Sequence, residues 1–210
     1  MTDKIKVVTP SGHLMYVNVT GKGKENFNQD GFDFVASVVL DKTKKTTVDF
    51  IAELNKIYKT KHQEGKTLRS MPFKYCDKDG NAKNEKGEVF TEANSSHIIV
   101  NAKTKTTFGD GAVKKINIKN AKAQNVELLD RKIGNGSIGA ISGIAGYYVN
   151  GRNDGLSFYL NAVQLLKFIE YKQDDGFAAQ DGDFEGFSDE ETGFEQVDEL
   201  PKEQARPSRL

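Results

Sequence analysis

The stretch that decides the fold is residues 132–168, KIGNGSIGAISGIAGYYVNGRNDGLSFYLNAVQLLKF. Two apolar segments, residues 138–149 and 156–171, flank a run of turn-forming residues at 150–155, which is the pattern of a β-hairpin. The first segment combines glycines with Tyr147 and Tyr148, a composition that favours a strand over a helix. The second segment fits helical spacing about as well as strand alternation, so its periodicity leaves both structures open.

Several short apolar and β-branched runs precede this stretch. We expect strands at residues 5–8, 14–19, 33–40, 96–102, 113–118 and 126–129. Residues 33–40 (DFVASVVL) carry apolar side chains on both faces, which is typical of a central strand. The chain is therefore expected to be mainly β.

One segment, at about residues 46–64, has helical periodicity instead. Thr46 or Thr47 can cap its first turn, and apolar residues then recur at spacings of three and four. This apolar stripe, which we expect to pack on the core, consists of Val48, Ile51, Leu54, Ile57 and Tyr58.

The charges of the chain are strongly divided between its two parts. Residues 174–210 hold twelve Asp and Glu against three Lys and Arg, a formal charge of −9, whereas residues 1–173 hold 27 Lys and Arg against 18 Asp and Glu, or +9. The acidic tail has isolated Phe residues and no period, so it cannot bury enough surface to fold. A basic body joined to an acidic arm suggests a polyanionic partner.

Basic residues alternate with aromatic residues at three places in the body, which is what the binding of single-stranded nucleic acid requires. The candidate binding residues are Arg69, Phe73, Lys74, Tyr75, Lys103, Lys105, Tyr147, Tyr148, Arg152 and Tyr159. Side chains alternate between the two faces of a strand, so about half of these rings should be buried.

The sequence offers little that points to catalysis. The single cysteine, Cys76, excludes a disulfide framework, and the three histidines lie in separate segments without the spacing of metal ligands. Residues 134–139 match G-x-G-x-x-G, but a dinucleotide site needs a helix after this loop, and the residues that follow favour a strand. We expect no enzymatic activity, no cofactor and no metal, with a nucleotide-dependent enzyme as a remote alternative.

Four segments, taken in order, give the chain a family resemblance. They are IGNGS at 133–137, GLSFYLNAVQ at 155–164, the strand at 34–40 followed by a helix, and IIVNAKTK at 98–105. Together with the acidic tail they resemble the single-stranded DNA-binding proteins of tailed phages. The resemblance implies an oligonucleotide-binding (OB) fold, with a five-stranded barrel, an inserted helix and extra hairpins. It also implies that residues 156–171 form a strand.

The resemblance further implies a role for the tail, which in this family recruits replication proteins and competes with DNA for the basic groove. The tail residues that we expect to make such contacts are Phe187, Asp189, Glu190, Glu191, Phe194, Asp198 and Glu199. This chain departs from the family at its end, PKEQARPSRL, where family tails commonly finish on acidic residues and an aromatic residue. Phe187 or Phe194 would then replace the terminal aromatic anchor.

Our hypothesis is a sequence-independent single-stranded DNA-binding protein that protects DNA during phage replication and recombination. Residues 1–171 would form the OB-fold domain and residues 172–210 a disordered tail that binds phage or host replication proteins. No apolar run reaches the roughly 18 residues of a membrane span, so we expect a soluble protein in the cytoplasm of the infected bacterium. Self-association is left open, and the alternative is an adaptor that works through its acidic tail without binding DNA.

Overall fold

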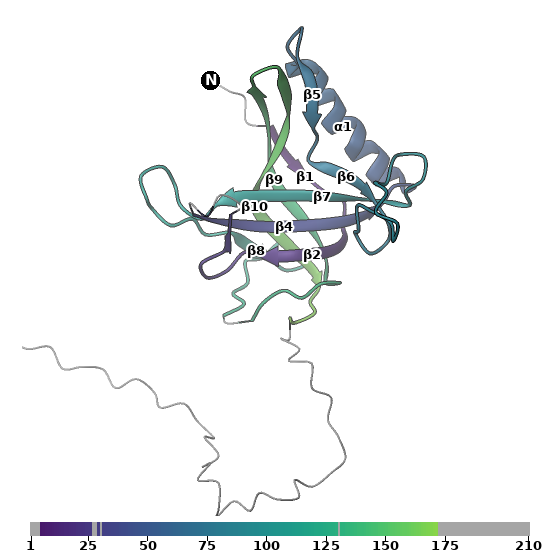
Figure 1. Cartoon of the computed structure of the whole chain (residues 1–210). Helices are drawn as coiled ribbons and strands as arrows, with labels where there is room; N and C mark the ends of the chain where they lie inside the picture. Colours follow the sequence, from purple (N-terminus) through teal and green to yellow (C-terminus); the bar gives the residue numbers. More distant parts are fainter. Residues whose placement is uncertain (1–4, 27–28, 30, 130, 172–210) are drawn as a thin grey trace, which may run out of the picture. The chain divides into compact units, whose positions relative to one another are not determined.

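A computed structural model describes residues 5–26, 29, 31–129 and 131–171 of the chain; the predicted acidic tail and its contact residues lie outside them. The described part contains one helix, α1 (Lys45–Lys61), and is otherwise built from strands (Figure 1). The strands are β1 (Ile5–Val8), β2 (Gly12–Asn18), β3 (Lys24–Glu25), β4 (Phe32–Asp41), β5 (Thr67–Ser70), β6 (Phe73–Cys76), β7 (His97–Lys105), β8 (Asn117–Lys119), β9 (Ile138–Asn150) and β10 (Asn153–Lys167).

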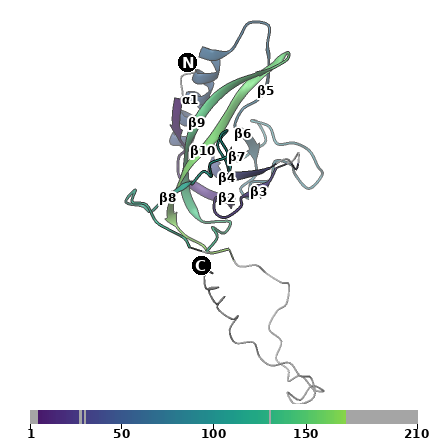
Figure 2. The same cartoon turned by 90° about the vertical axis from the view of Figure 1, so that its left-hand side faces the viewer.

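The longest feature is the hairpin of β9 and β10, which turns at Gly151 and Arg152. Gly151 adopts a φ of +58°, a left-handed conformation in which glycine carries no steric penalty. The whole of β10 is extended, so the strand implied by the resemblance is confirmed for the segment whose periodicity was ambiguous. Figure 2 shows the two strands running together along the length of the hairpin.

The strands form one sheet in the order β5-β10-β9-β2-β4-β7-β6, with β1 on β9, β3 on β4 and β8 on β10. β4 is a central strand, as predicted, because β2 and β7 pair with its two edges. β4 and β7 cross the β9–β10 hairpin (Figure 1), and buried residues of all four strands, such as Val38, Val100, Ile141 and Val163, share one core. The predicted class, mainly β and OB-like with an inserted helix, is confirmed.

The helix starts differently from our prediction. Lys44 is its N-cap and no side chain caps the helix, so neither Thr46 nor Thr47 has the predicted role. The turn that leads into the helix is instead stabilised by Asp41, before the first helical residue. Asp41 Oδ1 accepts hydrogen bonds from the Thr43 backbone N–H (2.9 Å) and hydroxyl (2.7 Å). Most of the predicted apolar stripe packs on the core: Leu54 and Ile57 are buried, and Ile51 and Tyr58 are partly buried against it. Val48 is 50% exposed instead, and Thr47 and Phe50 are the other buried residues of the helix.

One further prediction is corrected, and another, the strand after residues 134–139, is confirmed. Of the two short strands expected at 113–118 and 126–129, only Asn117–Lys119 forms a strand, and the rest is irregular chain with isolated bridges. The G-x-G-x-x-G segment at 134–139 leads into β9 instead of a helix, so it lacks the helix N-terminus that a pyrophosphate site requires.

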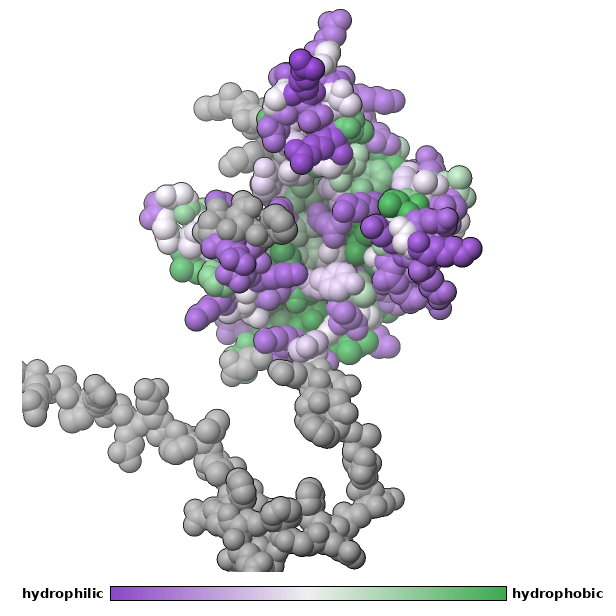
Figure 3. All heavy atoms as spheres, viewed as in Figure 1, coloured by the Kyte–Doolittle hydropathy of each residue, from purple (hydrophilic) through white to green (hydrophobic). Residues whose placement is uncertain are grey.

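The surface of the domain is mixed in character. On the face in Figure 3, hydrophobic residues lie in the middle and hydrophilic residues surround them. Within the described residues, no helix has both the length and the apolar character needed to span a bilayer.

Candidate functional site

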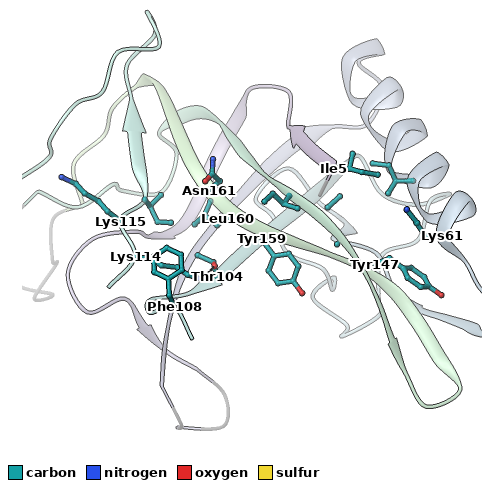
Figure 4. Close-up of a pocket in the computed structure, with 15 residues that line it drawn as sticks. Ile5, Lys61, Thr104, Phe108, Lys114, Lys115, Tyr147, Tyr159, Leu160 and Asn161 are labelled. Carbon is teal, nitrogen blue, oxygen red and sulfur yellow. Dashed lines mark hydrogen bonds between the residues drawn. The ribbon is translucent and has the colours of Figure 1, made fainter. Parts of the chain in front are cut away.

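A cleft of about 630 Å³ opens beside the β9–β10 hairpin, and its walls come from segments that are far apart in the sequence. α1 contributes Ile57 and Lys61, β7 contributes Thr104, and the hairpin contributes Tyr147 and Tyr159 (Figure 4). The segment after β7 completes the cleft with Phe108, Lys114, Lys115 and Ile116. We call this the Tyr159 cleft.

Tyr159 stands on the face of β10 that is turned away from the core. Its neighbours Phe158 and Leu160 are buried, whereas the Tyr159 side chain is 48% exposed. The ring lies against β9 at Gly146, where a Cβ would be only 2.6 Å from Tyr159 Cε2. The glycine therefore allows the ring to rest on the neighbouring strand while part of it stays open to the cleft.

A second exposed ring, that of Phe108, belongs to the same cleft, and Tyr159 lies between it and Tyr147 (Figure 4). Phe108, which is 55% exposed, belongs to a tight turn in which its N–H donates to Ala112 O at 2.8 Å. Lys114 Nζ lies 5.0 Å from the centroid of the Phe108 ring and donates to Thr104 Oγ1 at 3.2 Å. This cation–π contact and hydrogen bond hold the ring and the lysine beside β7.

The electrostatic character of the cleft follows from its lining. Among the described residues that line it, Lys61, Lys114 and Lys115 are the charged ones, and none is Asp or Glu. Lys115 is exposed and pairs with Glu127 at 3.2 Å, a contact that is worth little in water. Cations together with exposed rings provide what a strand of phosphates and bases needs.

A buried carboxylate fixes the hairpin to the helix next to this cleft. Asp154 of β10 is fully buried and accepts hydrogen bonds from the hydroxyls of Tyr58 (2.9 Å) and Tyr147 (2.7 Å). His62 Nδ1 lies 2.6 Å from the same carboxylate. Since Tyr58 and His62 lie at the end of α1, these contacts set the position of β9 and β10 against the helix.

The same contacts determine how Asp154 titrates. Burial alone would raise the pKa of its carboxyl, but the hydrogen bonds from Tyr147, His62 and Tyr58 outweigh burial and hold that pKa below its ordinary value. Burial, followed by the nearby carboxylate, raises the pKa of Tyr58 to about 12. The carboxylate is therefore kept ionised and the phenol neutral, which is the arrangement of a structural link.

The structure brings only two of the predicted binding residues, Tyr147 and Tyr159, to the lining of this cleft. The hydroxyl of Tyr147 is bound to Asp154 and to the N–H of Gln63 (3.2 Å), so this ring is held in place and half-buried. Tyr148 points away from the cleft lining, and its hydroxyl lies 2.6 Å from Ser70 Oγ.

The predicted residues of β6 and β7 lie elsewhere. Lys103 and Lys105 alternate with Thr104, so they lie on the face of β7 opposite the cleft. Phe73 and Tyr75 pair with Val100 and Ile98 and pack on the core, with their ring centroids 6.0 Å apart. The remaining predicted residues, Lys74, Arg69 and Arg152, are exposed on β6, on β5 and at the hairpin turn.

Residue patterns alone did not single out Lys61, Phe108, Lys114 and Lys115. Phe108 precedes a Gly-Asp-Gly turn and a Lys-Lys pair, which is a basic and aromatic run like those that were singled out. Lys61 carried no such signal, because only the packing of α1 beside the hairpin brings it to the cleft. Among the described residues, no three His, Cys, Asp or Glu side chains gather in a way that could hold a metal ion.

Comparison with known proteins places the fold. No family model and no curated protein matches the chain. The single-stranded DNA-binding protein encoded by bacteriophage T7 matches with a TM-score of 0.56 at 13% identity, over 88% of this chain and 98% of its own. The single-stranded DNA-binding protein of bacteriophage Enc34 matches with a TM-score of 0.53 at 12% identity, over 83% and 87%. The structure of the Enc34 protein in complex with single-stranded DNA matches with a TM-score of 0.53 at 13% sequence identity. The match covers 79% of this chain and 88% of the Enc34 chain. At these identities the likeness establishes a shared fold.

Proposed function

We propose that this protein binds single-stranded DNA without sequence preference and that the Tyr159 cleft is a principal part of its binding surface. The observation that carries the proposal is the pairing of two exposed rings, Tyr159 and Phe108, with three lysines in a cleft whose described lining residues include no carboxylate. Rings offer stacking surfaces to bases of any kind, and the lysines neutralise phosphates.

The proposed mechanism is electrostatic attraction followed by stacking. Lys61, Lys114 and Lys115 attract the phosphate backbone and displace its counterions, so affinity falls as salt rises. Bases then stack on Tyr159 and Phe108 inside the cleft. The exposed arginines Arg69 and Arg152, near the hairpin turn, extend the positive surface beyond it.

Two lines of support come from outside the cleft. Solved proteins that share this fold include single-stranded DNA-binding proteins of bacteriophages T7 and Enc34, and the Enc34 protein was also solved with single-stranded DNA. The sequence segments at 133–137, 155–164 and 98–105 resemble the same class of protein. The proposed setting is accordingly phage DNA replication and recombination in the cytoplasm of an infected bacterium.

We also propose that residues 1–171 form the binding domain and that the acidic residues 174–210 act as a separate arm. The arm carries −9 against +9 for the body, so it can compete with DNA for the lysines and contact replication proteins when DNA displaces it. Deleting residues 174–210 should tighten DNA binding, most visibly at low salt. Equal or weaker binding by the truncated protein would remove the competitor role and leave the DNA-binding proposal intact.

The decisive experiment is a fluorescence-anisotropy titration of labelled oligo-dT and of a matched duplex at two salt concentrations. Tight, salt-sensitive binding of the single strand and much weaker binding of the duplex are expected. If neither the full-length nor the tail-deleted protein binds the single strand, the proposal fails and the adaptor alternative takes its place.

A further inference from the structure

A second cleft, of about 300 Å³, is lined by two tyrosines that lie 155 positions apart in the sequence, Tyr16 and Tyr171. Tyr16 is 56% exposed and Tyr171 is 52% exposed. Lys24 and Lys132 also line this cleft, and no Asp or Glu is among those of its lining residues that the structure describes. The chemistry of the Tyr159 cleft, open rings beside lysines, is thus repeated at another place in the domain.

The backbone of Tyr16 is held in a conformation that tyrosine rarely adopts. Its φ is +52°, and the pairing of β2 with β4 shifts register between Met15 and Asn18, around this residue. The Asn135 side chain stabilises the arrangement, because its Oδ1 accepts a hydrogen bond from Tyr16 N–H at 2.8 Å. Such strain persists only where the surroundings impose it, and it is often found at ligand sites. Core packing does not explain it here, because the ring is exposed.

A third cleft, of about 580 Å³, adjoins both of the others. It shares Lys114, Lys115 and Ile116 with the Tyr159 cleft. It shares Val19, Thr20 and Leu128 with the cleft at Tyr16. The three clefts therefore adjoin one another in a row, which we call the track.

The middle of this track has apolar and basic walls. Val113 and Leu129 line it and are 78% and 79% exposed, which is unusual for side chains of this kind. Among its described lining residues the one carboxylate is Glu127, whose charge is matched by Lys115 at 3.2 Å. Counting only described residues, five lysines and one paired glutamate line the three clefts.

From this adjacency and charge we infer that Tyr16 and Tyr171 form a second stacking subsite, and that one DNA strand runs from the Tyr159 cleft past Lys114 and Lys115 to reach it. The inference rests on the proposed function and deepens it, because it names the path of the strand and the residues at its far end. Lys24 and Lys132 bind the phosphates of the nucleotides that stack there.

The test compares oligo-dT of increasing length, because a short strand can occupy the Tyr159 cleft alone and a long strand reaches both subsites. OB folds bind about 4–16 nucleotides, so lengths across that range are measured. The test variant carries Tyr16→Gly and Tyr171→Ala. Glycine accepts a φ of +52° without strain, so this change removes the ring without adding backbone strain.

The variant should bind the shortest oligonucleotides as tightly as the wild type does. Its affinity for the longest oligonucleotides should fall about 5- to 140-fold for each base that can no longer stack. At Tyr16→Gly the relief of backbone strain offsets the lost ring contacts, so thermal stability should stay near that of the wild type, a combination that a merely structural role of Tyr16 would not produce. A Tyr16→Phe variant, which keeps the ring, should retain long-strand affinity.

The two levels of the proposal fail in different ways. If the wild type binds no single strand at any length, the proposed function itself is overturned. If the wild type binds and Tyr159→Ala weakens it, but the Tyr16 and Tyr171 variant matches the wild type at every length, only the second subsite is overturned.

Discussion

Removing the Tyr159 ring should weaken DNA binding while the protein stays folded. One side of the ring lies on Gly146, and the side chain is 48% exposed, so the open side can serve one base. Stacking of one base on a protein ring is worth about 1–3 kcal/mol, so Tyr159→Ala should raise the Kd for oligo-dT about 5- to 140-fold.

The cost to folding should be small by comparison. Complete burial of an aromatic side chain contributes about 1.5–3 kcal/mol, so a half-buried ring contributes about 1 kcal/mol to the free energy of unfolding. The variant is then folded under assay conditions, and a thermal melt followed by circular dichroism checks this. The loss in affinity can then be assigned to the binding surface.

Two companion variants separate the ring from its position. Tyr159→Phe keeps the stacking surface, and the Tyr159 hydroxyl makes no hydrogen bond within the described part of the chain, so its Kd should stay near that of the wild type. Gly146→Ala keeps the ring but places a Cβ 2.6 Å from its Cε2, so the ring must move and binding should weaken to an intermediate degree.

The assay is the anisotropy titration with oligo-dT at low salt, where affinities are highest. A folded Tyr159→Ala protein with the Kd of the wild type would refute the placement of a base on this ring. Equal losses for the Phe and Ala variants would also refute it, because stacking does not need the hydroxyl.

Three other predictions concern charge, pH and packing. The logarithm of the DNA association constant falls as the logarithm of the salt concentration rises. Replacing both Lys114 and Lys115 with Ala should make this slope less negative by about 1.4, and an unchanged slope would mean that these lysines contact no phosphate. The lowered pKa of Asp154 means that its contribution to stability is present above its ordinary value of 3.8 and is lost as the pH falls through its lower, folded-state pKa. Asp154→Asn should therefore lower Tm at neutral pH and flatten the acid limb of a Tm–pH profile, and a variant with the wild-type profile would contradict this. Gly139→Ala places a Cβ 2.1 Å from Gln164 O and should cost about 1–3 kcal/mol in chemical denaturation, whereas Gly109→Ala, with open space around it, should be neutral; equal effects would refute the packing argument.

Much of the fold was readable from local patterns. The strand at 33–40 has apolar residues on both faces because β4 is covered on both faces and paired at both edges, so a central strand could be predicted. The helix was recognisable by its period, but its cap was not, because Asp41, just before the helix, makes the turn. The second arm of the hairpin was ambiguous in its period, and only its likeness to a known family indicated a strand.

The binding residues were less accessible to local reasoning. Basic and aromatic composition correctly placed rings on strands, but the face that each ring occupies depends on the pairing of β6 with β7, which turns Phe73 and Tyr75 to the core. Successive side chains of β7 point to opposite faces of the sheet, so Lys103 lies on the face opposite Thr104 and the cleft. A shift of one residue in register would reverse every one of these faces, and residues distant in the chain set that register.

By itself, then, the sequence determined what depends on composition and on near neighbours: the mainly β class, the helix, the hairpin turn and the separation of a basic body from an acidic arm. Tertiary structure alone decided which side chains meet. Lys61, Phe108 and Tyr159 come from three distant segments and share one cleft because α1, the segment after β7 and the β9–β10 hairpin pack around it. Composition sets which interactions a chain can make, whereas long-range pairing and packing set which side chains are close enough to make them.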